Sequence, residues 1–337
     1  MKTIILGKRS YLSNKLKLKI PSSTVYNVNE FKAFYLKNNT KFNLIINIFY
    51  PSSKLSDVNN YQNFFELSIK NLSLILDKIN HKHINKIIYT SSSSIYGSIN
   101  EHRYANDVNN RQLYSSTKLL NEIALNNYCQ KKNIQLIVSR LFNMYGPNEN
   151  FSIIHKLVQN IKDKKKIIIN NNGESVRDFI HVDDVCEIYL KLLNTKQSNI
   201  YDIGSGYGTK IKDILNILRI SKNKIIFKKK KINEVNNSIA NISKISEVIK
   251  KKTFIKIEDF LKKEVKNKLK GKTLNKIDNE HPNTINNHLN GSIIYGCGFA
   301  GKKLAKKLIG LNKNNVSYFV DDNPDLIGKK YLDKKII

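Results

Sequence analysis

The 337-residue sequence contains no apolar run of the length that a helix needs to cross a bilayer, about 20 residues. Its start, MKTIILGKRS, has an apolar stretch that is too short for the core of a signal peptide, and no small-residue cleavage pattern follows. We interpret this start as a first β-strand. These absences predict a cytoplasmic protein without a membrane span.

Cysteine is also scarce. The three cysteines, Cys129, Cys186 and Cys297, are scattered and show neither the spacing of a metal site nor that of a disulfide framework. We therefore expect a reducing compartment and no metal site.

Acidic residues are few, 27 against 58 lysines and arginines, so the formal net charge is +31. A basic surface can bind nucleic acid or an anionic membrane. Lysine is spread over the whole chain together with abundant asparagine and isoleucine, however, which indicates compositional drift. The densest lysine runs, 164–166 and 228–231, have no aromatic residues between them for base stacking. We predict no nucleic-acid partner, although a diffuse positive field would attract an anionic nucleotide substrate.

Short apolar runs alternate with amphipathic segments over the first 150 residues, which is typical of a parallel sheet with crossover helices. The predicted strands are Thr3–Leu6, Thr24–Val28, Asn43–Asn47, Lys86–Thr90 and Gln135–Arg140. The predicted helices between them include Asn59–Asn80 and Leu113–Gln130. We predict a doubly wound, Rossmann-like α/β fold, whose ligands bind at the carboxyl ends of its strands.

Beyond residue 150 the elements become shorter and less regular. They are a helix near Ile153–Ile161, a strand Ile167–Ile169, a helix Val182–Leu193 and a strand Ile200–Ile203. We predict one domain over residues 1–270, with a cofactor part at about 1–150 and a smaller mixed α/β substrate lobe at about 151–270. A polar linker, 271–290, and a partial Rossmann-like unit, 291–337, follow.

The last unit has a strand Ser292–Tyr295, the glycine-rich turn GCGFAG, a helix Lys302–Leu311 and a strand Val316–Val320. This is an intact dinucleotide fingerprint, with Asp321 and Asp322 about twenty residues after the turn. One βαβ unit cannot cover both faces of its own sheet, so it docks on something or begins a longer domain. It resembles the start of nucleotide-binding domains in polysaccharide-biosynthesis proteins, and we assign it no catalysis.

Four motifs with chemical potential occur in order. They are YTSSSSIYG (89–97), YSSTK (114–118), SRLFNMYGPNENF (139–151) and VRDFIHVDDV (176–185). Tyr114 and Lys118 lie one helical turn apart. A nearby ammonium, or the positive ring of an oxidised nicotinamide, would stabilise the phenolate of Tyr114 and make it a base at neutral pH. Ser92, at a strand end, could bind the same substrate oxygen and pass the proton along.

Each motif also has an ordinary structural interpretation. A tyrosine and a lysine four residues apart occur by chance on many helices. Arg177 and Asp178 could form a surface ion pair, and His181 could be a packed residue at a helix start. The joint occurrence of the motifs, in this order and spacing, favours a functional site.

With these motifs, residues 1 to about 269 resemble the NAD-dependent epimerase/dehydratase family of extended short-chain dehydrogenases. The resemblance implies that Tyr114 is the catalytic base, that Lys118 assists it and holds the nicotinamide ribose, and that Ser92 completes the triad. It further implies that Asn143 contacts the nucleotide sugar. Arg177 would clamp the substrate diphosphate, for which a planar, charged guanidinium is suited.

The family's sugar 4,6-dehydratases carry threonine, aspartate and glutamate where this chain has Ser92-Ser93-Ser94. Dehydration needs an acid and a base, which hydroxyls cannot supply. We therefore expect epimerisation or reduction of a nucleoside-diphosphate sugar for surface-polysaccharide synthesis, with Ser92 and Ser93 touching the substrate. The alternative is a non-catalytic protein that binds a nucleotide sugar or a dinucleotide on the same fold. Whether the chain forms a homodimer is left open.

The first glycine loop, GKRSYLS, departs from the family pattern because Ser10 and Ser13 replace two glycines that allow close approach of a pyrophosphate. The second strand ends at Asn27 without a clear acidic residue for a ribose 2′-hydroxyl. Together with Arg9, this favours NADP over NAD as the cofactor. The predicted cofactor contacts are Gly7, Arg9, Ser10, Tyr11, Leu12, Tyr114 and Lys118.

Overall fold

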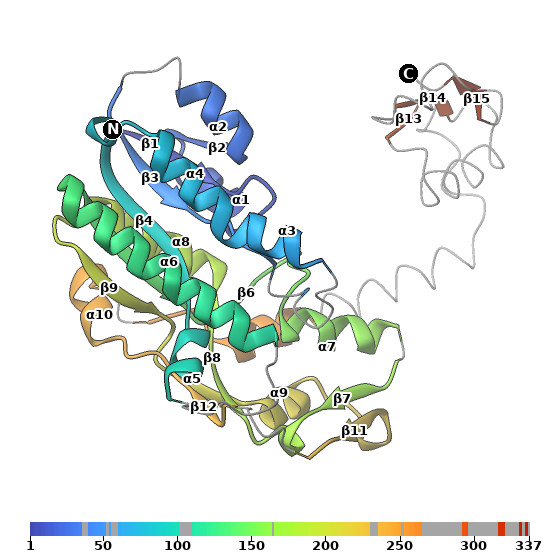
Figure 1. The fold of residues 1–337 in the computed structure, drawn as a ribbon. Helices are drawn as coiled ribbons and strands as arrows, with labels where there is room; N and C mark the ends of the chain where they lie inside the picture. Colours follow the sequence, from blue (N-terminus) through green and yellow to red (C-terminus); the bar gives the residue numbers. More distant parts are fainter. Residues whose placement is uncertain are drawn as a thin grey trace. The chain divides into compact units, whose positions relative to one another are not determined.

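The computed structural model describes residues 1–35, 40–51, 54, 60–100, 110–163, 165–229, 235–250 and 253–264, and four short strands beyond them. The chain divides into two compact units, Met1–Glu264 and Val265–Ile337. The first carries all four motifs with predicted chemistry (Figure 1). The predicted linker, 271–290, lies outside the described residues, and the predicted domain boundaries stay predictions.

The first unit is built on a sheet of six strands in the order β2-β1-β3-β4-β5-β9. All neighbours in this sheet are parallel. Its strands are β1 Lys2–Leu6, β2 Ser23–Tyr26, β3 Phe42–Ile46, β4 Ile84–Ser92, β5 Gln135–Leu141 and β9 Asn199–Ile203. The predicted Rossmann-like α/β fold is thereby confirmed.

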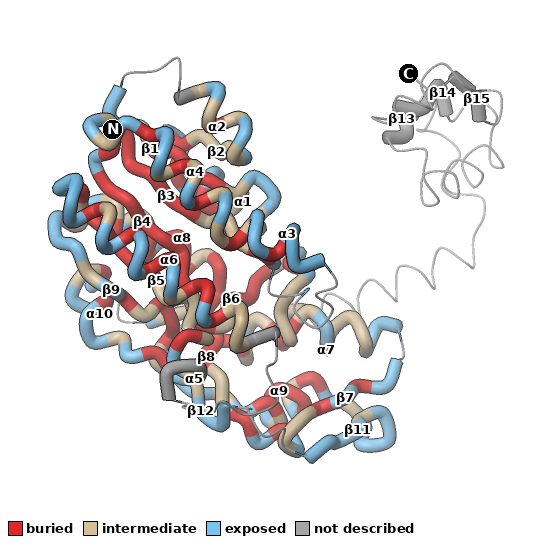
Figure 2. The backbone as a smooth tube through the Cα atoms, viewed as in Figure 1, coloured by how far each residue is buried: buried red, intermediate tan, exposed pale blue. Residues whose placement is uncertain are grey.

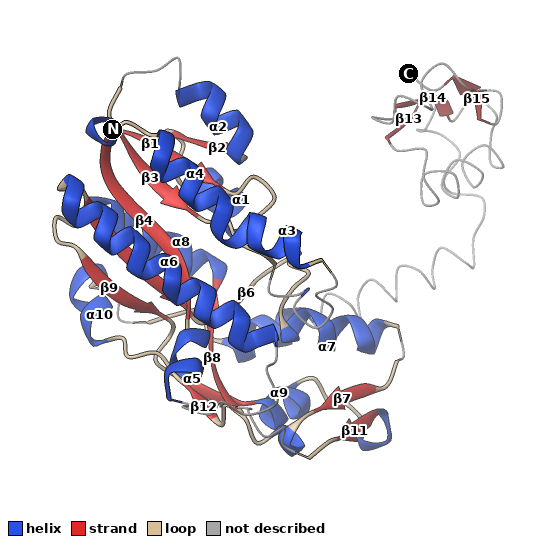
Figure 3. Cartoon of the chain, in the orientation of Figure 1, coloured by secondary structure: helices blue, strands red, loops and turns tan. Residues whose placement is uncertain are grey.

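Helices cover both faces of this sheet (Figure 3). They are α1 Tyr11–Lys19, α2 Val28–Tyr35, α3 Tyr61–Phe65, α4 Asn71–Lys78, α6 Asn110–Lys132, α8 Val182–Asn194 and α10 Ser243–Ile249. Because successive strand residues face opposite sides, Ile5 and Ile88 pack with α1, α8 and α10, whereas Ile4 and Ile87 pack with α2, α4 and α6. Two apolar layers result, and Figure 2 shows the sheet between them as the buried centre of the unit.

The predicted helix Asn59–Asn80 consists of three segments. A π-helical turn, Glu66–Lys70, separates α3 from α4. Within it the Ser68 carbonyl accepts a hydrogen bond of 2.7 Å from Asn121 Nδ2 of α6. A π-turn adds one residue to the helix, and the apolar periodicity of the sequence does not reveal such an insertion.

Shorter elements form the lobe beyond the carboxyl end of β5. They are α5 Ser94–Asn100, β6 Asn143–Tyr145, α7 Ile153–Lys162, β7 Ile167–Ile169, β8 Val176–His181, β10 Gly208–Lys210, α9 Ile211–Ile217, β11 Ile225–Phe227, β12 Asn237–Ser238 and a helix at 257–264. Strand β8 pairs with β6, β10 and β12, while β7 pairs with β11.

Two elements predicted in the lobe lie elsewhere. Strand β9 pairs with β5 as the sixth strand of the main sheet, and α8 packs against α1. The chain therefore returns to the main sheet after building part of the lobe. Sequence order could not show this, because the choice of sheet is made by pairing between residues far apart in the chain.

In the second unit, β13 Ser292–Tyr295 and β14 Val316–Val320 are parallel, as predicted. A short antiparallel pair, β15 Lys330–Tyr331 and β16 Lys334–Lys335, follows. The predicted GCGFAG turn, the helix at 302–311 and the two aspartates lie outside the described residues.

Candidate active site

The first loop leaves β1 through Gly7, which has φ = 126°. A Cβ at this position would lie 2.5 Å from the Asn47 carbonyl oxygen. The Gly7 amide also donates to the Tyr26 carbonyl at 3.0 Å, which brings the ends of β1 and β2 together. Both the backbone conformation and the space require glycine here.

The two serines that replace loop glycines are held by one side chain. Asn47 Nδ2, directly after β3, donates to Ser10 Oγ at 2.7 Å and to Ser13 Oγ at 2.9 Å. Ser10 is also the N-cap of α1. The loop therefore keeps a strand, a turn and a helix N-terminus at the carboxyl edge of the sheet, an arrangement that can bind a phosphate group. The Asn47 contact was missed, because no local signal links the end of β3 to the loop.

The other predicted loop contacts have different surroundings. Arg9 is exposed. The Tyr11 hydroxyl donates to the Pro147 carbonyl at 2.9 Å, and Leu12 is 2% exposed in the core. The side chain of Leu12 is therefore part of the core, and its contact with a cofactor stays a prediction.

An acidic residue does lie near the end of β2, three residues beyond Asn27. Glu30 accepts hydrogen bonds from Lys8 Nζ at 2.5 Å and from the Asn27 amide at 3.0 Å. The Glu30 amide donates back to Asn27 Oδ1 at 2.9 Å, which closes a reciprocal cap at the start of α2. The Lys8 hydrogen bond, assisted by that of Asn27, lowers the pKa of Glu30. This carboxylate lies beyond the predicted strand end, where no acidic residue was expected.

Strand β4 and helix α6 bring Ser92 and Tyr114 together. Burial raises the pKa of Tyr114 to about 12, and a hydrogen bond with the Ser92 side chain acts in the opposite direction. Lys118 Nζ donates to the Thr90 carbonyl at 2.7 Å, and the residue is 4% exposed. Burial lowers the pKa of Lys118 to about 7, against a smaller raising effect of Glu122. Burial thus shifts both groups toward their uncharged forms, but at neutral pH a substantial share of Lys118 still carries its proton.

An aromatic side chain covers this pair. Lys118 Nζ lies 4.1 Å from the centroid of the Phe49 ring and 5.0 Å from that of Tyr89. The Phe49 ring also meets the Tyr114 ring edge to face, at 5.0 Å between centroids and 82° between planes. Phe49 lies three residues after the end of β3, at the edge where the strands end. No sequence pattern singles this residue out, since an apolar residue after a strand is ordinary.

The predicted substrate contacts lie on neighbouring segments. Asn143 Nδ2 donates to the Asp178 carbonyl at 2.9 Å, which ties β6 to β8. Arg177 donates to the carbonyls of Val176 at 2.8 Å and Asn236 at 3.2 Å. The Ser93 amide donates to the Leu141 carbonyl at 3.0 Å, which holds the serine turn against the end of β5. The substrate roles of Ser93, Asn143 and Arg177 stay predictions.

Asp178 is the hub of the lobe. Its carboxylate is fully buried and accepts four hydrogen bonds, from the amides of Ser205, Gly206 and Ala240 and from the Ser205 hydroxyl. The alternative interpretation of Arg177 and Asp178 as a surface ion pair is therefore wrong for Asp178. His181 is the packed N-cap of α8, which confirms its structural interpretation.

A sequence profile of the NAD dependent epimerase/dehydratase family matches residues 23–204, more than half of the chain. The chain belongs to this family. The match begins after the first loop, where Ser10 and Ser13 depart from the glycine pattern.

Relatives of this family member include protein CapI of Staphylococcus aureus, 25% identical over 57% of this chain and 56% of CapI. The dTDP-D-glucose 4,6-dehydratase of Dictyostelium discoideum is 27% identical over 61% of this chain and 52% of the relative. The chain thus matches little more than half the length of these relatives. The chain shares its fold with the crystal structure of UDP-glucuronic acid 4-epimerase from Bacillus cereus in complex with UDP-glucuronic acid and NAD. The TM-score is 0.63 and the sequence identity is 21%, and the match covers 80% of this chain and 100% of that one.

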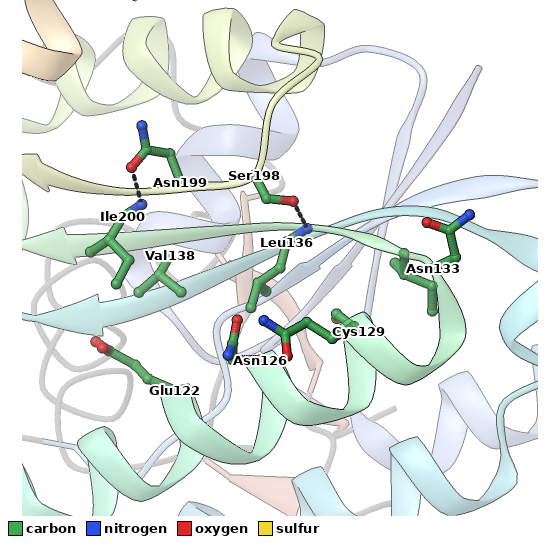
Figure 4. A pocket seen from close by; sticks show the side chains of 11 residues that line it. Glu122, Asn126, Cys129, Asn133, Leu136, Val138, Ser198, Asn199 and Ile200 are labelled. Atoms are coloured by element: carbon green, nitrogen blue, oxygen red, sulfur yellow. Dashed lines mark hydrogen bonds between the residues drawn. The ribbon is translucent and has the colours of Figure 1, made fainter.

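A cavity of about 520 Å³ lies elsewhere on this epimerase/dehydratase-family chain, between α6, β5 and β9 (Figure 4). Residues labelled around it include Glu122, Asn126, Val138 and Ile200. It contains none of the predicted site residues, so we do not connect it with the Ser92–Tyr114 pair. Glu122 at its border forms an ion pair of 2.7 Å with Arg140, which fixes α6 against β5.

Within the described ranges we find no cluster of side chains suited to a metal ion. No helix in the same ranges has the length and hydrophobicity of a membrane span.

Proposed function

We propose that this chain is an NAD(P)-dependent enzyme that epimerises or reduces a nucleoside-diphosphate sugar for surface-polysaccharide biosynthesis. The observation that carries the proposal is the hydrogen-bonded Ser92–Tyr114 pair, with Lys118 one helical turn away, at the carboxyl edge of a parallel sheet. The sugar nucleotide in the B. cereus epimerase structure and the name of that enzyme support the substrate class.

The residues present fit a dinucleotide at both ends of this edge. The positive φ of Gly7 and the N-terminus of α1 suit a pyrophosphate, while the half-buried Tyr114 and the buried Lys118 suit a nicotinamide ribose. When bound, the nicotinamide accepts or donates the hydride.

Tyr114 would move the proton at the substrate oxygen, with Ser92 bound to the same oxygen. A phenol that stays protonated at neutral pH can donate a proton to a carbonyl, and it becomes a base where positive charge is brought beside it. Arg177 would hold the diphosphate and Asn143 the sugar.

NADP rather than NAD is our proposal for the cofactor. Arg9 is exposed in the loop, and Lys8 neutralises the Glu30 carboxylate that would otherwise repel a 2′-phosphate. Dissociation constants measured by calorimetry test this. Tighter binding of NADP that is lost in Arg9→Gln supports the proposal, whereas equal binding of both cofactors removes it.

Epimerisation or reduction is favoured over 4,6-dehydration because hydroxyls stand at Ser92, Ser93 and Ser94. The Ser94 hydroxyl is buried and has no hydrogen-bond partner among the described residues, so it is available to a substrate hydroxyl. Thermal stabilisation by a panel of nucleotide sugars would identify the ligand. Mass and NMR analysis of the product would then show an unchanged mass for epimerisation or the gain of two hydrogens for reduction. The loss of one water would show dehydration and would refute the preference for epimerisation or reduction.

A non-catalytic binding protein is the second candidate. The hydrogen bonds of Asn47 to the two loop serines and the Phe49 ring over Lys118 favour it, because both occupy the edge where a dinucleotide would lie. Stabilisation by a nucleotide sugar without turnover, with either cofactor, would support this candidate.

The domain division predicted from the sequence, a cytoplasmic location and a homodimer are further proposals. Buried free thiols at Cys129 and Cys186 support a reducing compartment. Light scattering of the purified chain would decide the oligomeric state.

A further inference from the structure

Phe49 is the residue whose position most directly affects access to Lys118. Its ring lies over the ammonium at 4.1 Å and edge to face with Tyr114 at 5.0 Å. Lys118 is 4% exposed, and its Nζ already donates to the Thr90 carbonyl. We therefore expect a ligand hydroxyl to reach this nitrogen after the aromatic cover has moved.

The ring is held in place by a second set of contacts. Phe49 packs with the cluster of Tyr50 and Phe64, and its ring meets that of Phe64 at 6.4 Å and 87°. Phe49 itself is only half-buried, and it lies outside the regular part of β3. Rotation of this side chain therefore disturbs neither a strand hydrogen bond nor the two main apolar layers.

We propose that Phe49 closes the reactive pair, and that the nicotinamide ribose of NAD or NADP must displace its ring to bind Lys118. This inference rests on the proposed function. It makes Phe49 a residue that determines cofactor access, since the ring and the ribose compete for the same ammonium.

The competition has a measurable consequence. The closed state gains a desolvated cation–π contact and an edge-to-face aromatic contact that the bound state gives up. Apparent affinity is reduced by the fraction of molecules that are open. Phe49→Ala removes the stabilisation of the closed state, so cofactor affinity should rise on the order of tenfold.

The experiment measures the dissociation constants of NAD and NADP by calorimetry for the wild-type chain, Phe49→Ala and a control. Phe65→Ala is the control, since it removes a ring of 42% exposure that contacts Phe64 on α3, away from Lys118. Affinity should rise for Phe49→Ala and stay unchanged for Phe65→Ala. Phe49→Leu keeps an apolar side chain of similar volume but has no ring face, so it should also bind the cofactor more tightly. This variant replaces Phe49→Ala in the test if the alanine variant does not fold.

Chemical labelling gives a readout that is independent of turnover. Acylation of Lys118, located by peptide mass spectrometry, should be faster in Phe49→Ala than in the wild-type chain, and NAD or NADP should suppress it. Unchanged or weaker cofactor binding in both Phe49 variants overturns the inference, as does unchanged labelling of Lys118.

Failure of the inference can be told apart from failure of the proposed function. If the chain turns over a nucleotide sugar but the Phe49 variants bind the cofactor no more tightly than the wild type, the proposed function stands. The proposed competition between ring and ribose is then refuted. Tighter cofactor binding by the variants, in a chain that turns over no sugar, would support the competition between ring and ribose. It would refute the proposed enzymatic function.

Discussion

Replacing Asp178 by asparagine tests the buried hub that places Arg177. Oδ1 accepts from the amide and the hydroxyl of Ser205 at 2.8 and 2.7 Å, and Oδ2 accepts from the amides of Gly206 at 2.9 Å and Ala240 at 3.1 Å. Each oxygen therefore faces two donors. The amide nitrogen of asparagine is itself a donor, so either orientation leaves two donors without an acceptor.

A hydrogen bond to a charged group contributes about 1.5–3 kcal/mol, and the loss of two should lower the free energy of unfolding by about 3–6 kcal/mol. That is a large part of the roughly 5–15 kcal/mol by which proteins are stable. The side chain is isosteric, so packing is unchanged and the effect isolates the hydrogen bonds.

Urea unfolding followed by circular dichroism measures the difference. Asp77→Asn is the matched control, because Asp77 is 68% exposed next to Lys78 and its loss should change stability by less than about 0.5 kcal/mol. A change below about 1 kcal/mol in Asp178→Asn would refute the assignment of a buried hub.

Two further variants test the loop and the reactive pair. Ser10→Ala removes the N-cap of α1 and a hydrogen-bond acceptor for Asn47. The midpoint of urea unfolding should therefore fall by the equivalent of about 1 kcal/mol. An unchanged midpoint would contradict the capping role of Ser10. Lys118→Met removes a lysine whose pKa is lowered by burial to about 7 in the folded protein from its ordinary value of 10.5. Between these two values the unfolded wild-type chain binds more protons than the folded one, so its unfolding free energy should rise with pH relative to the variant, by at most about 1.4 kcal/mol per pH unit. Parallel stability curves of the two proteins from pH 7 to 9 would contradict the lowered pKa of this buried amine.

The parts of the fold that the sequence predicts well are those that depend on local pattern. The apolar runs of β1, β3, β4 and β5 are buried on both faces, so each run indicates a strand by itself. The spacing of Tyr114 and Lys118 on α6 follows in the same way from helical geometry.

The remainder depends on contacts between residues far apart in the chain. Strand β9 gains its place from pairing with β5, and the four donors of Asp178 come from residues 205–240. The same holds at the site, where Asn47 reaches Ser10 and Phe49 reaches Lys118 from a different strand end. No spacing rule connects these pairs, so they become visible only with the fold.

The most direct test of the central claim is the turnover of Tyr114→Phe with the nucleotide sugar that stabilises the wild-type chain. The phenol is assigned the proton transfer, so turnover should fall by about 10²–10⁴-fold while the dissociation constant of the sugar nucleotide stays nearly the same. Tyr61→Phe, at an exposed tyrosine of α3, should behave as the wild type. Retention of most of the activity by Tyr114→Phe would contradict the proposed mechanism.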